Sequence, residues 1–226
     1  KTIIQKKEIN GELRKPKDIE ILFGEDTITE INEYGIKYKI DLSKIMWSSG
    51  NTGWRSILNG PKKVQEFYTF NKPKTIVDFF AGIGYFSIQL AKSYPNSRII
   101  SIDKNKNSIK YLQENIKING IKNIEIINDD CRDVNVKADV IHLGYIGNTL
   151  EFLDHAKNCL QEGGIVIFHE AYPNSWLGFK KRADWGGVPE KFSQLMAEKG
   201  FFTAKFERVK FYGPNKSHII AKLVKV

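Results

Sequence analysis

The sequence has few residues of the kinds that cross-link a chain or hold a metal ion. Its only two cysteines, Cys131 and Cys159, stand apart and fit no Cys/His ligand spacing, so we expect no metal site. With so little cysteine, a reducing, cytoplasmic setting is the default expectation. The four histidines are scattered and no serine lies in a Gly-x-Ser-x-Gly elbow, which argues against a nucleophilic triad.

Long apolar runs are also missing. No stretch approaches the roughly 20 apolar residues that a membrane-spanning helix needs. The first ten residues, KTIIQKKEIN, lack the apolar centre of a secretion signal, so we expect no membrane partner. Hydrophobic residues make up 41% and charged residues 27% of the 226 residues, which excludes a disordered or fibrous chain.

Basic residues outnumber acidic ones, with 35 Lys and Arg against 26 Asp and Glu and a net charge of +9. The excess is concentrated at the two ends. Residues 1–17 hold six bases and two acids, and residues 161–226 hold eleven bases and six acids. This distribution favours a nucleic-acid surface built from both ends of the chain. A solvated lysine-rich surface is the alternative explanation.

Two different hydrophobic patterns divide the chain. In residues 1–60 every second residue of several stretches is apolar, which predicts a small β-rich module. Within it, MWSSGNTGW (46–54) predicts a loop. In residues 61–226 strands and helices alternate, which predicts a mainly parallel sheet covered by helices, closed by an antiparallel pair of strands. The predicted strands are 75–80, 98–103, 123–128, 138–144, 163–170, 201–212 and 217–226, and the predicted helices are 61–70, 87–94, 107–119, 149–160 and 188–200.

A glycine-rich turn follows the first strand of the second part. The segment Asp78-Phe-Phe-Ala-Gly82-Ile-Gly84 allows a tight turn and a close approach to a ligand. The following helix offers unpaired N–H groups. The third glycine of the dinucleotide fingerprint is missing, so a pyrophosphate-binding site fits less well.

Acidic residues follow the neighbouring strands. Asp103 is placed to accept both hydroxyls of a ribose, and Asp130 to accept from an adenine amino group. Acids beside a glycine turn repel a phosphate but suit a cationic nucleoside, so the sequence predicts a site for S-adenosylmethionine. Ordinary strand-end acids beside a tight turn are the alternative. The residues predicted for this site are Asp78, Phe79, Ala81, Gly82, Gly84, Asp103, Lys104, Asp130 and Gly144.

The predicted strand 138–144 ends in His142-Leu143-Gly144-Tyr145. Many amino-group methyltransferases have Asn/Asp-Pro-Pro-aromatic at this place, where the polar side chain holds the target amine. The replacement argues against transfer to an exocyclic amine. His142 is a candidate catalytic residue, and a structural, hydrogen-bonded histidine is an equally good explanation.

Six segments resemble archaeal and eukaryotic enzymes that modify position 37 of tRNA. They are GELRKP (11–16), MWSSGN (46–51), DFFAGIGYFSI (78–88), HLGYIGNTLEFLDHA (142–156), FHE (168–170) and YGPNKSH (212–218). This family has two branches, the tRNA guanine-37 N1-methyltransferases and the aminocarboxypropyltransferases of wybutosine synthesis. The resemblance implies a Rossmann-like S-adenosylmethionine-dependent methyltransferase fold of the α/β class, with a mostly parallel seven-stranded sheet and the anticodon loop of tRNA as partner.

Two positions separate the branches. Where the methyltransferases have Asn-Leu-Pro or Asn-Pro-Pro, this chain has His142-Leu-Gly-Tyr, which resembles the aminocarboxypropyl branch. The methyltransferases also have a glutamate, implied as the general base, before the arginine that matches Arg55. Here that residue is Trp54, which takes up no proton. The aminocarboxypropyl branch usually has an acid near this position as well, so Trp54 departs from both patterns.

The resemblance also implies roles for single residues. Five residues match cofactor-binding positions: Ser48, Arg55, Asp103, Asp130 and Cys131. Arg14 matches an arginine implied in catalysis in the methyltransferase branch, with phosphate binding as the alternative. The implied acceptor is a tricyclic guanosine derivative that leaves its stack and is held by aromatic rings. The candidates for contacts to the base or the tRNA are Asn51, Trp54, Tyr145, His169, Lys180, Lys181 and Arg182, with Trp47, Trp176 and Trp185 as further stacking candidates; core packing and solvated charge are the alternatives.

The sequence therefore predicts a monomeric, cytoplasmic enzyme that transfers the 3-amino-3-carboxypropyl group of S-adenosylmethionine to tRNA. It divides into a β-rich module, residues 1–60, and a catalytic domain, residues 61–226. A tRNA guanine-37 N1-methyltransferase is the nearest alternative. A tRNA-binding relative that keeps the fold without activity is the third, since fold alone does not fix function.

Overall fold

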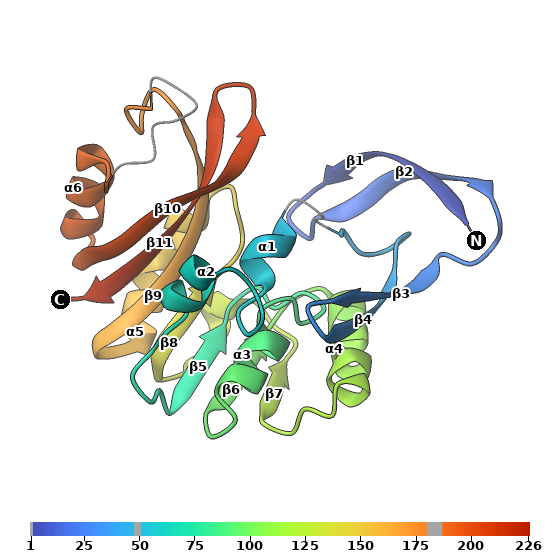
Figure 1. The fold of residues 1–226 in the computed structure, drawn as a ribbon, viewed down its shortest axis with the longest axis horizontal. Helices are drawn as coiled ribbons and strands as arrows, with labels where there is room; N and C mark the ends of the chain where they lie inside the picture. Colours follow the sequence, from blue (N-terminus) through green and yellow to red (C-terminus); the bar gives the residue numbers. More distant parts are fainter. Residues whose placement is uncertain (1, 48–50, 180–186) are drawn as a thin grey trace.

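The computed structural model describes residues 2–47, 51–179 and 187–226. Its centre is a seven-stranded sheet with the strand order β10-β11-β9-β8-β5-β6-β7 (Figure 1). Strands β5 to β9 pair in parallel, which confirms the predicted α/β class with a mostly parallel sheet. The seven strands are β5 (Thr75–Asp78), β6 (Arg98–Ile102), β7 (Ile124–Ile127), β8 (Ala138–Leu143), β9 (Leu160–Pro173), β10 (Phe201–Gly213) and β11 (Lys216–Lys225).

Helices cover both faces of this sheet because consecutive strand residues are apolar. Ile76 of β5 and Ile99 of β6 pack on one face, and their neighbours Val77 and Ile100 pack on the other. A strand buried on both sides needs this continuous apolar run. The helices are α1 (Thr52–Arg55), α2 (Lys62–Phe67), α3 (Ser87–Ser93), α4 (Lys106–Ile118), α5 (Leu153–Cys159) and α6 (Glu190–Glu198), with 3-10 turns at Cys131–Asp133 and Thr149–Phe152. In the described ranges, no helix is long and apolar enough to span a membrane.

The closing pair of strands enters the sheet in reverse order. Strand β11 lies inside, antiparallel to both β9 and β10, and β10 forms the edge. The predicted antiparallel end of the sheet is therefore confirmed. Because β9 extends to Pro173, three residues beyond the predicted strand, it gives β11 a long partner, with Ala221 opposite Phe168.

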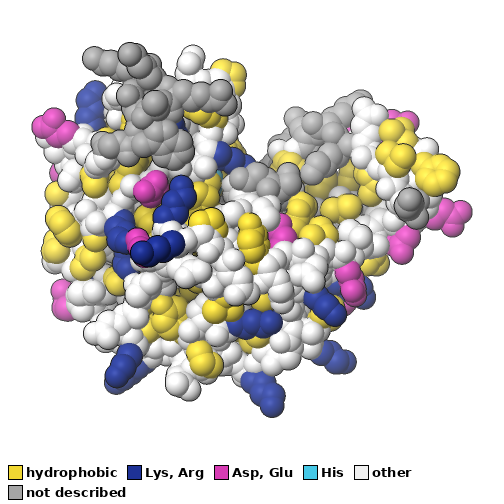
Figure 2. All heavy atoms as spheres, viewed as in Figure 1, with side chains coloured by type: hydrophobic (Ala, Val, Ile, Leu, Met, Phe, Trp, Pro, Cys, Tyr) yellow, Lys and Arg dark blue, Asp and Glu magenta, His cyan; other side chains and the backbone are white. Residues whose placement is uncertain are grey.

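Residues 2–41 contain two separate hairpins rather than one sheet. Strands β1 (Ile3–Asn10) and β2 (Lys15–Phe23) make the first, and β3 (Ile28–Glu33) and β4 (Ile36–Asp41) the second. Alternation did not reveal β1, in which polar residues fill most positions. In Figure 1 the first hairpin and the end of the β10–β11 pair stand on opposite sides of α1, and Figure 2 shows the surface hollowed between them.

Two asparagines of α4 attach the second hairpin to the sheet domain. Asn115 accepts from Lys39 N (2.7 Å) and donates to Lys39 O (3.2 Å) and Ile83 O (3.1 Å). Asn119 accepts from Lys37 N (3.0 Å) and donates to Lys37 O (2.7 Å). Four helical residues rise about 6 Å and two strand residues about 6.6 Å, so the two amides match alternate residues of β4. The edge of β4 is thereby paired.

The second hairpin also shares a hydrophobic core with the sheet domain. Ile36, Tyr38 and Ile40 pack with Ile83 and Ile88, next to the glycine-rich turn. A boundary at residue 60 therefore runs between segments that are packed together. The division into two domains stays a prediction.

The loop predicted for residues 46–54 is wrong at its end. Residues Thr52–Arg55 form α1, a single turn of helix, and Trp54 and Ile57 are buried against Phe67 and its neighbours. The burial of two apolar residues outweighs the turn-forming composition of the segment. Residues 48–50 lie outside the described part of the chain.

Candidate active site

A cavity of about 240 Å³ opens at the carboxyl ends of β5, β6 and β8. Strand order reverses at β5, and crevices at such a position are the usual ligand sites of open α/β sheets. Segments from both ends of the chain complete its wall, among them the β1–β2 turn and strand β10. The structure brings eleven of the predicted site residues to this cavity: Arg14, Asn51, Arg55, Phe79, Gly82, Asp103, Lys104, Asp130, Cys131, Gly144 and Tyr145.

The glycine-rich turn serves both the cavity and the packing beneath it. Gly82 has φ +57° and lines the cavity, whereas Gly84 has φ +95° and lies below it. A Cβ on Gly84 would lie 2.7 Å from Ile88 Cδ1 and 2.8 Å from Leu112 Cδ1, so only glycine fits. Asp78 is fully buried and accepts a hydrogen bond from Ser87 Oγ (2.7 Å).

Asp78, Ala81 and Gly84 thus differ from the other predicted cofactor residues. None of the three lines the cavity. Ala81 is buried, and its N–H donates to Ile102 O (2.9 Å). Their position indicates that they shape the turn that presents Gly82.

Asp103 has hydrogen-bonding capacity left for a ligand. Its Oδ2 accepts from Gly82 N (2.7 Å) and its Oδ1 from Asn105 N (2.8 Å). Each carboxylate oxygen has a second lone pair, which suits two adjacent hydroxyls of a ribose. Burial raises the pKa of Asp103 to about 6, although the hydrogen bonds from the two backbone N–H groups act in the opposite direction and lower it.

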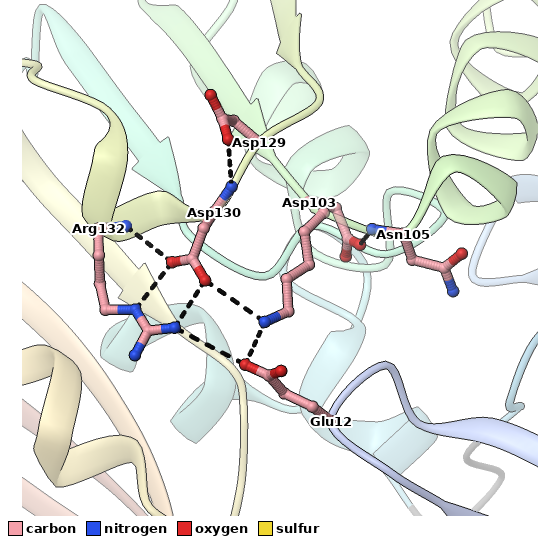
Figure 3. A network of polar contacts seen from close by, with 7 residues as sticks. Glu12, Asp103, Asn105, Asp129, Asp130 and Arg132 are labelled. Atoms are coloured by element: carbon pink, nitrogen blue, oxygen red, sulfur yellow. Dashed lines mark hydrogen bonds and ion pairs between the residues drawn. The ribbon is translucent and has the colours of Figure 1, made fainter.

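Asp130 is already saturated by two cations (Figure 3). Its Oδ1 accepts from Arg132 N (3.0 Å) and Nε (2.9 Å), and its Oδ2 from Arg132 Nη2 (2.7 Å) and Lys104 Nζ (3.3 Å). These bonds hold the pKa of Asp130 far below its usual range. Four bonds use the four acceptor positions of a carboxylate. An adenine amino group must therefore displace one of them, which the sequence did not predict.

Glu12 joins this network from the β1–β2 turn. Its Oε1 contacts Lys104 Nζ and lies 3.7 Å from Arg132 Nη2 (Figure 3). The tip of the first hairpin thus reaches the loops after β6 and β7. Cys131, beside the network, is buried, and burial raises the pKa of its thiol to about 12, so it stays protonated at neutral pH.

Arg55 lines the cavity, and an ion pair with Glu33 holds its side chain in place. Its Nε and Nη2 donate to the two carboxylate oxygens of Glu33 (3.1 and 2.7 Å), and both side chains are almost fully buried. The guanidinium also lies over the rings of Trp47 (4.6 Å) and Tyr85 (5.0 Å). A forked ion pair between two rings holds a planar guanidinium in one orientation.

Arg14 and Tyr145 meet on the opposite side of the cavity. Arg14 Nη2 donates to Ile146 O, Nη1 donates to Tyr212 OH (3.4 Å), and the guanidinium lies 5.0 Å from the centre of the Tyr145 ring. Tyr145 in turn stacks on Phe80, with ring centres 4.9 Å apart. These aromatic and cationic groups form a surface on which a planar base can stack.

The loop that carries Tyr145 is tied down by a buried carboxylate. Glu170 Oε1 accepts from Gly147 N (2.6 Å) and Oε2 from Thr149 N (2.7 Å). Glu170 ends the FHE segment, and the sequence gave no signal for this capping role because its partners lie more than 20 residues away.

His142 and His169 lie in the core instead of at the cavity. Tyr68 OH lies 3.2 Å from His142 Nε2 and 3.4 Å from His169 Nε2. His142 Nδ1 lies 3.3 Å from Asp78 Oδ1, and His169 Nδ1 lies 3.0 Å from His218 Nε2. Burial keeps the pKa of His169 and His218 below the usual range of histidine. Neither histidine lines the cavity, and the catalytic role of His142 and the substrate contact of His169 stay predictions.

Trp54 has a packing role as well. It is 6% exposed, lies edge-on to Phe67 and does not line the cavity. Trp176 stacks on Tyr172 (4.4 Å), away from the cavity. The remaining predicted contacts, Ser48, Lys180, Lys181, Arg182 and Trp185, lie outside the described residues.

The arrangement can now be compared with known proteins. The TRM5/TYW2 methyltransferase domain matches residues 29–184. This chain belongs to the TRM5/TYW2 family. It is 35% identical, over 93% of its length and 72% of the relative's, to the tRNA(Phe) (4-demethylwyosine(37)-C(7)) aminocarboxypropyltransferase of Methanocaldococcus jannaschii. The resemblance inferred from the six segments is therefore confirmed.

Two solved structures bear on the site. The crystal structure of M. jannaschii TYW2 in complex with AdoMet superposes with a TM-score of 0.73 at 33% identity, covering 92% of this chain and 91% of the other. The complex of aTrm5 and tRNALeu superposes with a TM-score of 0.80 at 26% identity, covering 100% of this chain and 61% of the other. Both branches of the family thus share this architecture.

The residues at the cavity fit S-adenosylmethionine. Asp103 offers free acceptor positions for ribose hydroxyls, the apolar side chains of Phe79 and Phe152 provide contact area for a base, and Arg55 offers positive charge for a carboxylate. Three carboxylates at the cavity, those of Asp103, Asp129 and Asp130, disfavour a phosphate.

Proposed function

We propose that this TRM5/TYW2 chain transfers the 3-amino-3-carboxypropyl group of S-adenosylmethionine to a tricyclic guanosine derivative at position 37 of tRNA. The observation that carries this proposal is the end of β8. Only Gly144 and Tyr145 of His142-Leu-Gly-Tyr line the cavity, so the strand presents an aromatic ring and no side-chain amide or carboxylate. Such a wall suits a planar base that reacts through carbon, whereas an exocyclic amine needs a polar holder.

S-adenosylmethionine would supply the group. In this transfer the bond between sulfur and the terminal carbon of the aminocarboxypropyl chain breaks and its electron pair stays on sulfur. The same carbon becomes bonded to the acceptor carbon, which releases a proton to solvent. The chain's own residues orient the partners. Asp103 and Gly82 hold the nucleoside, and Arg55, fixed by Glu33, sets the charge of the opposite wall. Arg14 and Tyr145 hold the acceptor base by stacking and by charge.

Trp54 counts against N1 methylation, although it also departs from the usual pattern of the aminocarboxypropyl branch. The acid implied as a base in the methyltransferase branch is replaced by a ring buried against Phe67. Glu33, the carboxylate beside Arg55, is bound to that arginine through both oxygens. Both oxygens of this carboxylate are therefore already engaged by the guanidinium.

The tRNA is proposed to bind across the hollow between the first hairpin and the β10–β11 pair (Figure 2). Arg14 lines the cavity and donates a hydrogen bond to Tyr212 OH (3.4 Å), and the Tyr212 side chain is 43% exposed. Phosphate contacts from cations position the RNA, and exposed rings are available for an unstacked base. The protein is further proposed to act as a monomer in the cytoplasm, where its buried, unpaired thiols Cys131 and Cys159 stay reduced.

The test uses S-adenosylmethionine with different labels on its methyl and carboxyl carbons. The protein is incubated with tRNA from a strain that lacks the enzyme, and with tRNA that carries the tricyclic precursor. Carboxyl label in tRNA, together with released methylthioadenosine, is the expected result. Methyl label in tRNA would identify a guanine-37 methyltransferase instead. If neither tRNA is labelled, a binding protein without this activity remains, and a tRNA titration measures that binding.

A further inference from the structure

The carboxylates and the cations that line the cavity come mostly from different parts of the fold, with Lys104 beside the carboxylates. Asp103, Asp129 and Asp130 follow β6 and β7, at one edge of the sheet. Lys210 belongs to β10, at the other edge, and Arg55 faces the cavity from α1. A ligand that carries a neutral nucleoside at one end and a carboxylate at the other matches this polarity.

Lys210 differs from the other cations of the cavity. Arg55 is bound to Glu33, Lys104 to Asp130 and Glu12, and Arg14 to Ile146 O. In the described part of the chain, no carboxylate pairs with Lys210. Burial and the nearby charge of Arg55 lower its pKa. Two like charges facing one cavity repel each other, and an anion between them removes that repulsion.

Asn51 provides the complementary acceptor. It lines the cavity, and its Oδ1 is buried without a hydrogen-bond partner in the structure. A buried amide oxygen without a partner is costly, about 1–3 kcal/mol, and the large majority of such atoms have one. Asn51 precedes α1 and Arg55 ends it, four residues later, so both side chains lie on one side of that turn.

We infer that Asn51, Arg55 and Lys210 form a subsite for an α-amino acid group, in which Lys210 binds the carboxylate and Asn51 Oδ1 accepts from the ammonium. The inference rests on the proposed use of S-adenosylmethionine. It assigns Lys210 as the residue that fixes the far end of the aminocarboxypropyl chain. Holding that end restricts the positions of the carbon that is transferred, which is how orientation selects among several reactive carbons.

The carboxylate contact is tested by calorimetric titration of Lys210→Met with three ligands. S-adenosylmethionine has both groups, decarboxylated S-adenosylmethionine keeps only the ammonium, and methylthioadenosine lacks the chain. A charge-assisted hydrogen bond corresponds to a change in Kd of about tenfold to a hundredfold. We expect this loss for S-adenosylmethionine alone, with the Kd of the other two ligands unchanged within twofold.

Asn51→Ala tests the ammonium contact separately. It should weaken S-adenosylmethionine and its decarboxylated form by the same factor and leave methylthioadenosine unchanged. Lys205→Met is the matched control, because Lys205 lies on the same strand and pairs at the surface with Glu66 (3.7 Å), away from the cavity. It should change none of the three values, and thermal melting of each variant checks folding.

Three results would overturn the inference. Equal weakening of all three ligands by Lys210→Met would indicate a general distortion of the cavity. An unchanged Kd for S-adenosylmethionine would remove the carboxylate contact. A loss of tRNA affinity alone would make Lys210 a phosphate contact. Failure of the proposed function is distinguishable, since methyl label in tRNA from the unmodified protein refutes aminocarboxypropyl transfer whatever the ligand selectivity of the variants.

Discussion

Replacing Asn115 by alanine tests how the N-terminal hairpins are joined to the sheet domain. Asn115 is fully buried and makes three hydrogen bonds to the backbone of Lys39 and Ile83. A net loss of about 1 kcal/mol per bond gives about 3 kcal/mol of destabilisation. That is a large share of the 5–15 kcal/mol typical of a folded domain.

The comparison with Asn119 makes the expectation specific. Asn119 makes the same pair of bonds to β4 but is partly exposed, so water replaces its partners. We therefore expect Asn119→Ala to cost only about 1 kcal/mol. Urea unfolding followed by circular dichroism gives both free energies from the midpoint and the slope.

Asn115→Asp provides the decisive control. It keeps an acceptor for Lys39 N but places a second oxygen against two carbonyl oxygens, Lys39 O and Ile83 O. At pH 7 it should destabilise the protein at least as much as alanine, because a buried charge then faces acceptors. Equal free energies of unfolding for the unmodified protein and for both Asn115 variants would refute the anchoring role.

The anchor also bears on the cavity. The second hairpin carries Glu33, which holds Arg55, so loosening β4 should weaken cofactor binding through a residue that the cofactor does not touch. Titration of Asn115→Ala with S-adenosylmethionine, at a temperature where the variant is folded, measures this coupling. An unchanged Kd would show that Arg55 keeps its position without the anchor.

Three further predictions concern pH and packing. Affinity for S-adenosylmethionine should fall about tenfold at pH 5 relative to its plateau above pH 7, because Asp103, with its pKa raised to about 6, then loses the charge that accepts ribose hydroxyls. Asp103→Asn should abolish this pH dependence. A titration of the unmodified protein that shows the same affinity at both pH values would contradict the prediction. Between pH 7.5 and 5 the protein should lose about 2 kcal/mol of stability through His218, because burial lowers the pKa of this histidine from 6.5 to about 3 in the folded state. Its contribution to stability is present above pH 6.5 and is lost as pH falls, and His169 acts in the same direction. Urea unfolding of His218→Gln should show a smaller loss between the two pH values. Gly84→Ala should cost about 2 kcal/mol or more by forcing a Cβ into Ile88 and Leu112 at positive φ, whereas Gly11→Ala, with open space around it, should cost less in the same unfolding assay.

The fold was predictable because its signals are local. Strands buried on both faces read as apolar runs, as in Ile76-Val77 and Ile99-Ile100, and the glycine turn follows the first of them directly. The position of Asp103 at the cavity was predictable for the same reason, since strand ends meet at one edge of a parallel sheet. Strand β1 was missed because polar residues fill most of its positions, so the sequence shows no regular alternation there.

The failures at the site come from contacts between distant residues. Glu33 and Arg55 are 22 residues apart, and Glu12 and Lys104 are 92 apart, so no spacing in the sequence links them. His142 shows the limit of reasoning from strand ends. It precedes the last residue of β8, so its side chain still points into the layer of Tyr68 and Phe86, while Gly144, two residues on, reaches the cavity.

The turn of the first hairpin lines the cavity, but its strands add no residue to the hydrophobic core in the described part of the chain. None of the described residues of β1 and β2 belongs to a hydrophobic core cluster, and Ile21, Leu22 and Phe23 are exposed. Its tip is held instead by polar contacts on both sides of the cavity, Glu12 to Lys104 and Arg14 to Ile146 O. Exposed ion pairs contribute about 0–1 kcal/mol, so these contacts fix the place of the tip more than they stabilise the fold. Through Glu12 the same turn contacts the part of the cavity where the cofactor is proposed to bind, and through Arg14 it contacts the part where the acceptor base is proposed to bind. The turn is therefore the structural link between the two substrates of the proposed reaction.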